Sequence, residues 1–290
     1  MSYSSNTMTY RKQLPSVPNL ANFLQSIFPV RSGDTQFYYH SPRRATSSEF
    51  SHVVLSVTPT PGLYTAISNS PCQSPLTFLH RPWKLDRKHL PSGATVLSSH
   101  KGFDEVLTVG ANTALASSLG IALKDSIVIQ GYKGSPDRTI GIVGPLVSPV
   151  PRRDLLDSIA TEFVTTEGHF GFDQPRGDAG DKPITTVAIM NAFHPDEVDR
   201  VVAAAQAIGT VSAVPVSSGI LYLTGAVREQ GLQAALAREM AVVCVGHRAC
   251  EEWGIRHLAK ILTNEWPLLH VDVILEEETE VKASHPLAAH

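Results

Sequence analysis

Cysteine, net charge and long apolar runs are all scarce in this sequence, and each shortage excludes a class of protein. Only three cysteines, Cys72, Cys244 and Cys250, occur among the 290 residues. This odd number argues against a disulfide framework and favours a reducing compartment. The formal net charge of −3 provides no basic surface for nucleic acid or for an anionic membrane. No run of about 18 apolar residues is present, so the sequence predicts no membrane-spanning helix.

The N-terminal segment has no acidic side chains. Residues 1–33 contain several basic and hydroxyl residues but no Asp or Glu, a composition weakly similar to an organelle transit peptide. The apolar pattern of residues 20–28, closed by Pro29, instead predicts a helix that is part of the fold. We therefore expect a disordered tail over residues 1–18 and a cytoplasmic protein, with a mitochondrial or nuclear location as the alternative.

Helix and strand patterns alternate along the chain, which is typical of α/β proteins. Short apolar runs predict strands at residues 53–57, 76–79, 94–99, 126–129, 138–146, 185–190, 220–224, 241–245 and 270–274. Helical periodicity predicts helices at residues 20–28, 63–69, 110–119, 153–163, 196–208, 229–240 and 248–266, and the composition of residues 31–50 and 168–183 predicts loops.

The length suits one large or two ordinary domains. We expect an N-terminal α/β domain at residues 19–147, a C-terminal α/β domain at residues 148–275 and an acidic, polar tail at residues 276–290.

Side chains with metal-ligand chemistry follow three of the predicted strands. Open α/β sheets place their sites at the carboxyl ends of strands, and imidazole with carboxylate suits Zn, Fe, Mn or Ni. Three corners together therefore favour convergence on one ion or on a pair. The residues concerned are His80, His100 with Asp104, and His247 with Glu251.

The corner at Gly246–Glu251 shows how weak each signal is by itself. His247 and Glu251 lie four residues apart, so they share one helix face if the helix begins by Arg248. Taken alone, this spacing favours an ordinary helix N-terminus with a surface histidine and a glutamate near the positive end of the dipole. A metal site is favoured only when this corner is considered together with the other two.

The order and spacing of these motifs resemble those of the NIF-three-like family (NGG1-interacting factor three-like), also called the GTP cyclohydrolase 1 type 2 family. The resemblance extends from residue 20 to residue 274. The family has an Asp-Pro-Thr-Pro-like turn, His-His-Pro, Ala-His-Thr-Asn-x-Asp, a glycine-rich strand, Thr-Gly-Glu and Gly-His-x-x-Ser-Glu, in that order. The corresponding segments here are Thr58-Pro59-Thr60-Pro61, His80-Arg81-Pro82, Ser99-His100-Lys101-Gly102-Phe103-Asp104, Gly141-Ile142-Val143-Gly144, Thr224-Gly225-Ala226 and Gly246-His247-Arg248-Ala249-Cys250-Glu251.

The resemblance implies two interlinked α/β domains of similar build, with mixed sheets and a metal site in the cleft between them. It implies His80, Asp104, His247 and Glu251 as metal ligands and His100 as a catalytic acid/base group beside the metals.

This sequence departs from the family at Arg81, Lys101 and Ala226, where the family has His, Thr and Glu. An arginine stays protonated and cannot ligate a metal. Arg81 and Lys101 are therefore candidates for binding a phosphate or carboxylate of a substrate. The alternatives are a site reduced to one metal, a loss of activity that leaves an interaction module, and for Arg81 a plain solvated charge. Cys250, at the Ser position, is expected to be inert.

The function implied by the resemblance is a metal-dependent hydrolase with a dinuclear site. Its substrate would be a small molecule, phosphorylated or nucleotide-like, and its cofactors one or two divalent ions of Zn, Fe, Mn or Ni. The alternative is a non-catalytic metal-binding scaffold or regulatory interaction protein with a mononuclear site. The resemblance also implies a homo-oligomer and allows a protein partner.

Overall fold

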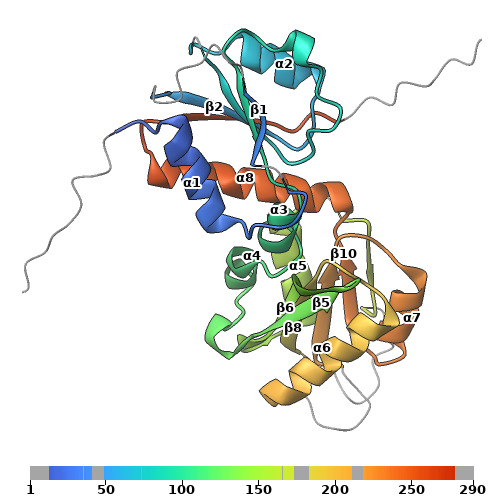
Figure 1. Ribbon diagram of the computed structural model, residues 1–290. Helices are drawn as coiled ribbons and strands as arrows, with labels where there is room; N and C mark the ends of the chain where they lie inside the picture. The colour runs from blue at the N-terminus through green and yellow to red at the C-terminus, as the bar shows by residue number, and fades with distance from the viewer. Residues whose placement is uncertain are drawn as a thin grey trace, which may run out of the picture.

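Two mixed sheets divide the strands of the protein between them (Figure 1). The computed structural model describes residues 13–34, 36–40, 49–72, 74–164, 166–172, 183–210 and 218–277. The first sheet has the order β1 (Phe37–His40), β4 (Thr95–Ser98), β3 (Leu76–Leu79), β2 (His52–Ser56) and β11 (His270–Ile274). The second has the order β5 (Ile127–Tyr132), β6 (Ser135–Val150), β8 (Ile184–Met190), β9 (Ile220–Thr224), β10 (Ala241–Cys244) and β7 (Gly168–Phe170).

Both sheets are mixed, with parallel pairing in the centre and antiparallel pairing at one edge of the first sheet and at both edges of the second. In the first sheet β4, β3, β2 and β11 are parallel, and β1 runs antiparallel to β4. In the second sheet β8, β9 and β10 are parallel, whereas β5, β6 and β7 add antiparallel edges. The central strands are buried throughout, which explains why they are continuous apolar runs in the sequence.

Helices cover the faces of both sheets. Residues of α6 and α7 pack on one face of the second sheet and residues of α4 and α5 on the other. Helix α2 covers one face of the first sheet, and α1 and α8 lie side by side on the opposite face (Figure 1). The helices are α1 (Val17–Ile27), α2 (Pro61–Ser68), α3 (Lys101–Val106), α4 (Thr113–Ser118), α5 (Arg152–Glu162), α6 (Pro195–Ile208), α7 (Glu229–Leu236) and α8 (His247–Glu265).

Helix α8 belongs to both cores. Cys250 and Trp253, in its first two turns, pack in the core of the second sheet. Ile255, Leu258 and Leu262, further along, pack in the core of the first sheet with α1. One helix therefore fixes the two sheets relative to each other, and its N-terminal end lies where they meet. No helix of the described residues is long and apolar enough to cross a membrane.

Several elements differ from the sequence predictions. Strand β1 lies in the predicted loop at residues 31–50, and β7 lies in the predicted loop at residues 168–183. Both are short edge strands without a buried apolar alternation, so periodicity gives no signal for them. Helix α1 begins at Val17, inside the span of 1–18 expected to be a tail, because Ser16 caps it and Val17 is buried; residues 1–12 of that span lie outside the described residues.

The sheets do not follow a division of the chain at residue 148. That position lies within β6, and both β5 and β6 belong to the second sheet. The last strand, β11, returns to the first sheet beside β2. Of the tail expected at residues 276–290, residues 278–290 lie outside the described residues.

Candidate metal centre

The three predicted corners converge where the two sheets meet. His80 directly follows β3, His100 precedes the first residue of α3, and His247 is the first residue of α8. His80 and His100 lie at the carboxyl ends of the parallel strands β3 and β4, where such sheets place functional groups. The side chains of these corners contact one another, although they come from segments far apart in the sequence.

His80 is the buried centre of this cluster, with none of its surface exposed. Its Nδ1 lies 3.2 Å from the carbonyl oxygen of Ser99, so Nδ1 carries a proton and donates it. Its Nε2 faces two carboxylate oxygens, Asp104 Oδ1 at 3.4 Å and Glu251 Oε1 at 3.2 Å. A lone pair cannot face two acceptors favourably, so a second proton or a metal cation belongs at Nε2.

The charges of the cluster are strongly coupled. Burial disfavours the imidazolium form of His80, but hydrogen bonds with Asp104 and Glu251 outweigh burial and raise its pKa to about 9. Burial likewise disfavours the carboxylate of Glu251, but hydrogen bonds with His247 and His80 lower its pKa to about 2. At neutral pH the metal-free centre therefore pairs the protonated imidazole of His80 with the ionised carboxylate of Glu251.

Two ligand-type atoms at the centre are buried without a hydrogen-bond partner among the described residues, His100 Nδ1 and Glu251 Oε2. His100 Nδ1 lies 3.8 Å from Asp104 Oδ2, beyond hydrogen-bond distance. The ligand atoms of His80, His100 and Asp104 all lie within 4.8 Å of one another. Buried polar atoms normally have partners, and a divalent cation is a partner that fits imidazole and carboxylate together.

Arg81 occupies the other side of Glu251. Its guanidinium donates to Glu251 Oε1 at 2.6 Å and also contacts Nε2 of His247. Nε2 of His247 lies 3.3 Å from the same carboxylate oxygen. The guanidinium therefore contacts both His247 and one oxygen of Glu251, and it places a fixed positive charge between them.

Asp34 stabilises the corner between β4 and α3, although no motif of the sequence points to it. Its Oδ1 accepts a hydrogen bond from the backbone N–H of His100 at 2.6 Å. Its Oδ2 accepts from the backbone N–H of Gly102 at 2.9 Å and from Ser99 Oγ at 3.0 Å. The only available signal was that Asp34 is the first acidic residue of the chain.

Two further residues lie beside His100, and the substrate-binding role predicted for one of them, Lys101, stays a prediction. Lys101, predicted to bind substrate, donates its Nζ to the carbonyl of Ser32 at 2.7 Å, and no contact recorded for it in the described part of the chain reaches the cluster. Trp83, which the sequence did not single out, is 60% exposed and meets the ring of His100 edge to face, with centroids 4.7 Å apart. An exposed indole beside the cluster offers a flat apolar surface.

Two glycines lie at and beside the start of α8. Gly246 has a φ of +95°, which an L side chain rarely adopts. A Cβ on Gly225 would lie 3.3 Å from Cys250 Sγ and 3.7 Å from the backbone of His247. Burial raises the pKa of the Cys250 thiol, with a smaller contribution from the Glu251 carboxylate. The thiol therefore stays protonated, in agreement with the inert role expected for it.

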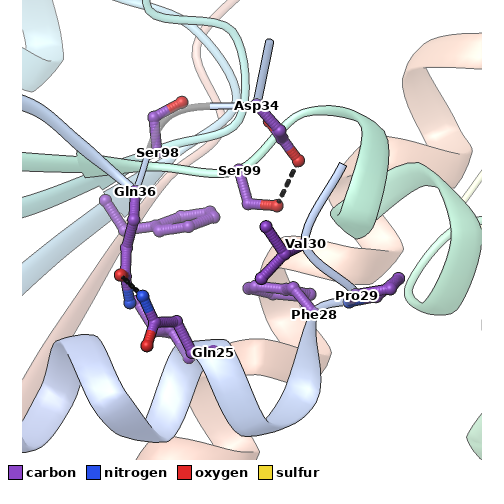
Figure 2. A pocket seen from close by; sticks show the side chains of 10 residues that line it. Gln25, Phe28, Pro29, Val30, Asp34, Gln36, Ser98 and Ser99 are labelled. Carbon is purple, nitrogen blue, oxygen red and sulfur yellow. Dashed lines mark hydrogen bonds between the residues drawn. The ribbon is translucent and has the colours of Figure 1, made fainter. Parts of the chain in front are cut away.

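A cavity of about 140 Å³ lies behind the β4–α3 corner. Figure 2 shows it between the end of α1, with Phe28, and the polar side chains of Gln25 and Gln36. Asp34 and Ser99, whose side chains are hydrogen-bonded to each other in this view, line the cavity. None of the predicted metal ligands lines this cavity, so it is distinct from the candidate metal centre.

Comparisons with known proteins agree with the resemblance stated above. No family model matches the chain. A GTP cyclohydrolase 1 type 2 homolog of Pseudomonas aeruginosa is 26% identical over 182 residues, which cover 63% of this chain and 62% of that protein. The match thus spans less than two thirds of the relative's length.

Solved structures show the same fold. Protein ybgI, a protein of unknown function, superposes with a TM-score of 0.56 and 20% identity over 90% of this chain and 98% of its own. A Bacillus cereus protein related to NIF3 superposes with a TM-score of 0.57 and 12% identity over 93% of this chain and 99% of its own. The mixed α/β architecture with two mixed sheets is therefore shared across these proteins.

Proposed function

We propose that this chain, which resembles the NIF-three-like family in sequence and in fold, is a metal-dependent hydrolase with a single divalent ion. The observation that carries the proposal is the set of buried ligand atoms around His80. Nε2 of His80 faces two carboxylates, and buried atoms of His100 and Glu251 lack partners among the described residues. A divalent cation would satisfy the ligand atoms of His80, His100 and Asp104, which lie within 4.8 Å of one another, and Glu251 lies beside them at His80.

His80, His100, Asp104 and Glu251 would hold the ion, and Zn, Fe, Mn and Ni all suit such ligands. The family resemblance implied an acid/base role for His100. Its close grouping with His80 and Asp104 and its unpartnered Nδ1 favour a ligand role instead.

The second ion of a dinuclear site would need His247, Glu251 and the side chain at position 81. Arg81 cannot ligate, and its guanidinium already contacts both other residues. We therefore assign Arg81 the place of the second cation.

When bound, the ion supplies a water whose pKa is lowered towards 7 and polarises the bond under attack. The protein's own residues would orient the metal ligands and neutralise negative charge. Ser99 orients the ring of His80 through its carbonyl. Arg81 pairs with Glu251 at 2.6 Å and keeps 27% of its side chain exposed, so its remaining donors suit an anionic oxygen of the substrate. A small phosphorylated or nucleotide-like substrate fits this charge.

The alternative is a non-catalytic metal-binding scaffold or regulatory protein. It is favoured by the same Arg81, because a site that has lost one ligand has also lost the bridged pair of ions used for in-line displacement. Assembly into a homo-oligomer and binding of a protein partner remain predictions of the resemblance.

The proposal is tested by metal content and turnover in matched variants. Chelator-treated protein is reloaded with Zn²⁺ or Mn²⁺, desalted and analysed for metal, and then assayed on GTP, other nucleoside triphosphates and p-nitrophenyl phosphate. Asp104→Asn is expected to lose one ion per chain and all turnover. Asp86→Asn, which alters an exposed aspartate paired with His89, is the control and should lose neither. Unchanged metal content in Asp104→Asn would refute the metal centre, whereas metal binding without turnover would favour the scaffold.

A further inference from the structure

A second group of metal-ligand side chains lies at the opposite ends of the first-sheet strands. His52 begins β2 and His270 begins β11, and the two residues are partners in the parallel register. Asp272 follows two residues along β11, so it lies on the same face of the sheet as His270. The candidate centre at His80 lies beyond the carboxyl ends of these parallel strands, so the two clusters are separated by the length of a strand.

The geometry of this group is that of a ligand set. Asp272 Oδ2 lies 2.9 Å from His52 Nε2, and Asp272 Oδ1 lies 3.0 Å from His270 Nε2. One ligand atom from each residue lies within 4.8 Å of the other two. The two imidazole rings have centroids 5.2 Å apart and are tilted by 32°. Both Nε2 atoms therefore point to one carboxylate from the same side.

His52 is held in place from behind. It is 3% exposed, and its Nδ1 lies 2.7 Å from Ser70 Oγ. Ser70 Oγ also accepts the backbone N–H of Cys72 at 3.3 Å. When a histidine binds a metal through Nε2, its Nδ1–H donates a hydrogen bond to a neighbouring oxygen, and this bond fixes the orientation of the ring. His270 is 69% exposed at its side chain, so the group is open to solvent on one side.

We propose that His52, His270 and Asp272 form a second divalent-cation site, of the zinc class, that fastens β11 to β2. Two imidazoles and one carboxylate with an open position suit Zn²⁺ or a similar ion. The site links the only described strand that returns to the first sheet after the second sheet is built. It shares no residue with the centre at His80 and does not depend on hydrolysis.

The test compares Zn²⁺ binding in His270→Ala and in His89→Ala. His89 is a matched control, since it is an exposed histidine 3.0 Å from the carboxylate of Asp86 but belongs to no group of three ligand side chains among the described residues. Wild type and His89→Ala are expected to bind one Zn²⁺ more per chain than His270→Ala. Zn²⁺ should also raise the melting temperature of wild type more than that of His270→Ala. Because His270 is exposed, its removal should leave the far-UV circular dichroism unchanged.

A second variant tests the support of His52. Ser70→Ala should weaken this Zn²⁺ site about 10- to 100-fold, the usual effect of losing a group that orients a ligand. In both tests Zn²⁺ should shift the imidazole NMR signals of His52 and His270 in wild type.

Equal Zn²⁺ content in wild type and His270→Ala, with unshifted imidazole signals, would overturn the proposal and leave a hydrogen-bonded His–Asp–His clamp. The result is distinguishable from failure of the centre at His80, because Asp104→Asn reports on that centre alone. A wild-type chain with one ion that Asp104→Asn removes would refute this second site and retain the first.

Discussion

Replacing Arg81 with histidine should give the centre a second metal ion at the expense of stability without metal. Arg81 donates to Glu251 at 2.6 Å, and Glu251 has only 1% of its side chain exposed. A hydrogen bond to a charged group contributes about 1.5–3 kcal/mol. Because Arg81 is 27% exposed, solvent screening places the expected loss in Arg81→His nearer about 1–2 kcal/mol. An imidazole at position 81 would then complete a ligand set with His247 and Glu251.

Urea unfolding in chelator and in excess Zn²⁺, together with metal analysis, measures both effects. In chelator, Arg81→His should unfold at lower urea than wild type. With Zn²⁺ at 100 times its Kd, one additional site contributes about 2.7 kcal/mol, so the order should reverse and the metal content should rise by one ion per chain.

Arg81→Leu is the control for the lost ion pair, since it removes the charge and supplies no ligand. It should lose similar stability in chelator and gain no ion. An unchanged metal content in Arg81→His would refute the idea that the arginine stands in place of a second ion. An equal gain in Arg81→Leu would show that charge alone excludes that ion.

Three further predictions follow from contacts around the centre. The pKa of His80 is raised to about 9, so in chelator protonated His80 should contribute on the order of 3 kcal/mol to the unfolding free energy. This contribution should be full below pH 6.5 and lost as the pH rises through 9. Urea unfolding against pH measures it, and a flat profile in wild type identical to that of His80→Asn would contradict it. Asp34→Asn weakens the acceptor that orients the β4–α3 corner and should lower metal affinity about 10- to 100-fold in competition with a chromophoric chelator, whereas unchanged affinity would refute that role. Arg31→Ala leaves the fully buried Glu105 without its ion pair and should lower the unfolding free energy by about 3 kcal/mol, while Asp137→Ala, at the exposed end of the same arginine, should change it by less than about 1 kcal/mol.

Much of the fold was predictable because its central strands are buried on both faces. Continuous apolar runs such as those of β2, β9 and β10 are unambiguous, and the long amphipathic α6 ends at a glycine with a φ of +81°. Edge strands β1 and β7 were missed because a partly solvated edge needs no apolar pattern. The return of β11 to the first sheet was also missed, because local sequence does not encode which strands become neighbours.

The positions of the residues at the metal centre were predictable from the sequence, but the contacts between their side chains were not. Residue types and strand ends located His80, His100 and Glu251, and the structure brings them together. The contact of Arg81 with Glu251 depends on side-chain reach across 170 residues of chain, and the turning of Lys101 to Ser32 depends on the path of a loop. Neither leaves a periodic trace. Their roles in metal and substrate binding stay predictions until they are tested.

The return of β11 and the position of α8 also determine when, during synthesis, the first sheet and the metal centre can be completed. His80 meets a carboxylate 171 residues further along the chain, and β2 receives its neighbour β11 only after Ile274 has been made. Contacts of such separation form late, because loop closure precedes any compensating interaction. Until then β2 presents an open edge that other chains can pair with. A ribosome that stalls after β10 would hold a chain with every described strand of the second sheet, an unfinished first sheet and a metal centre without Glu251.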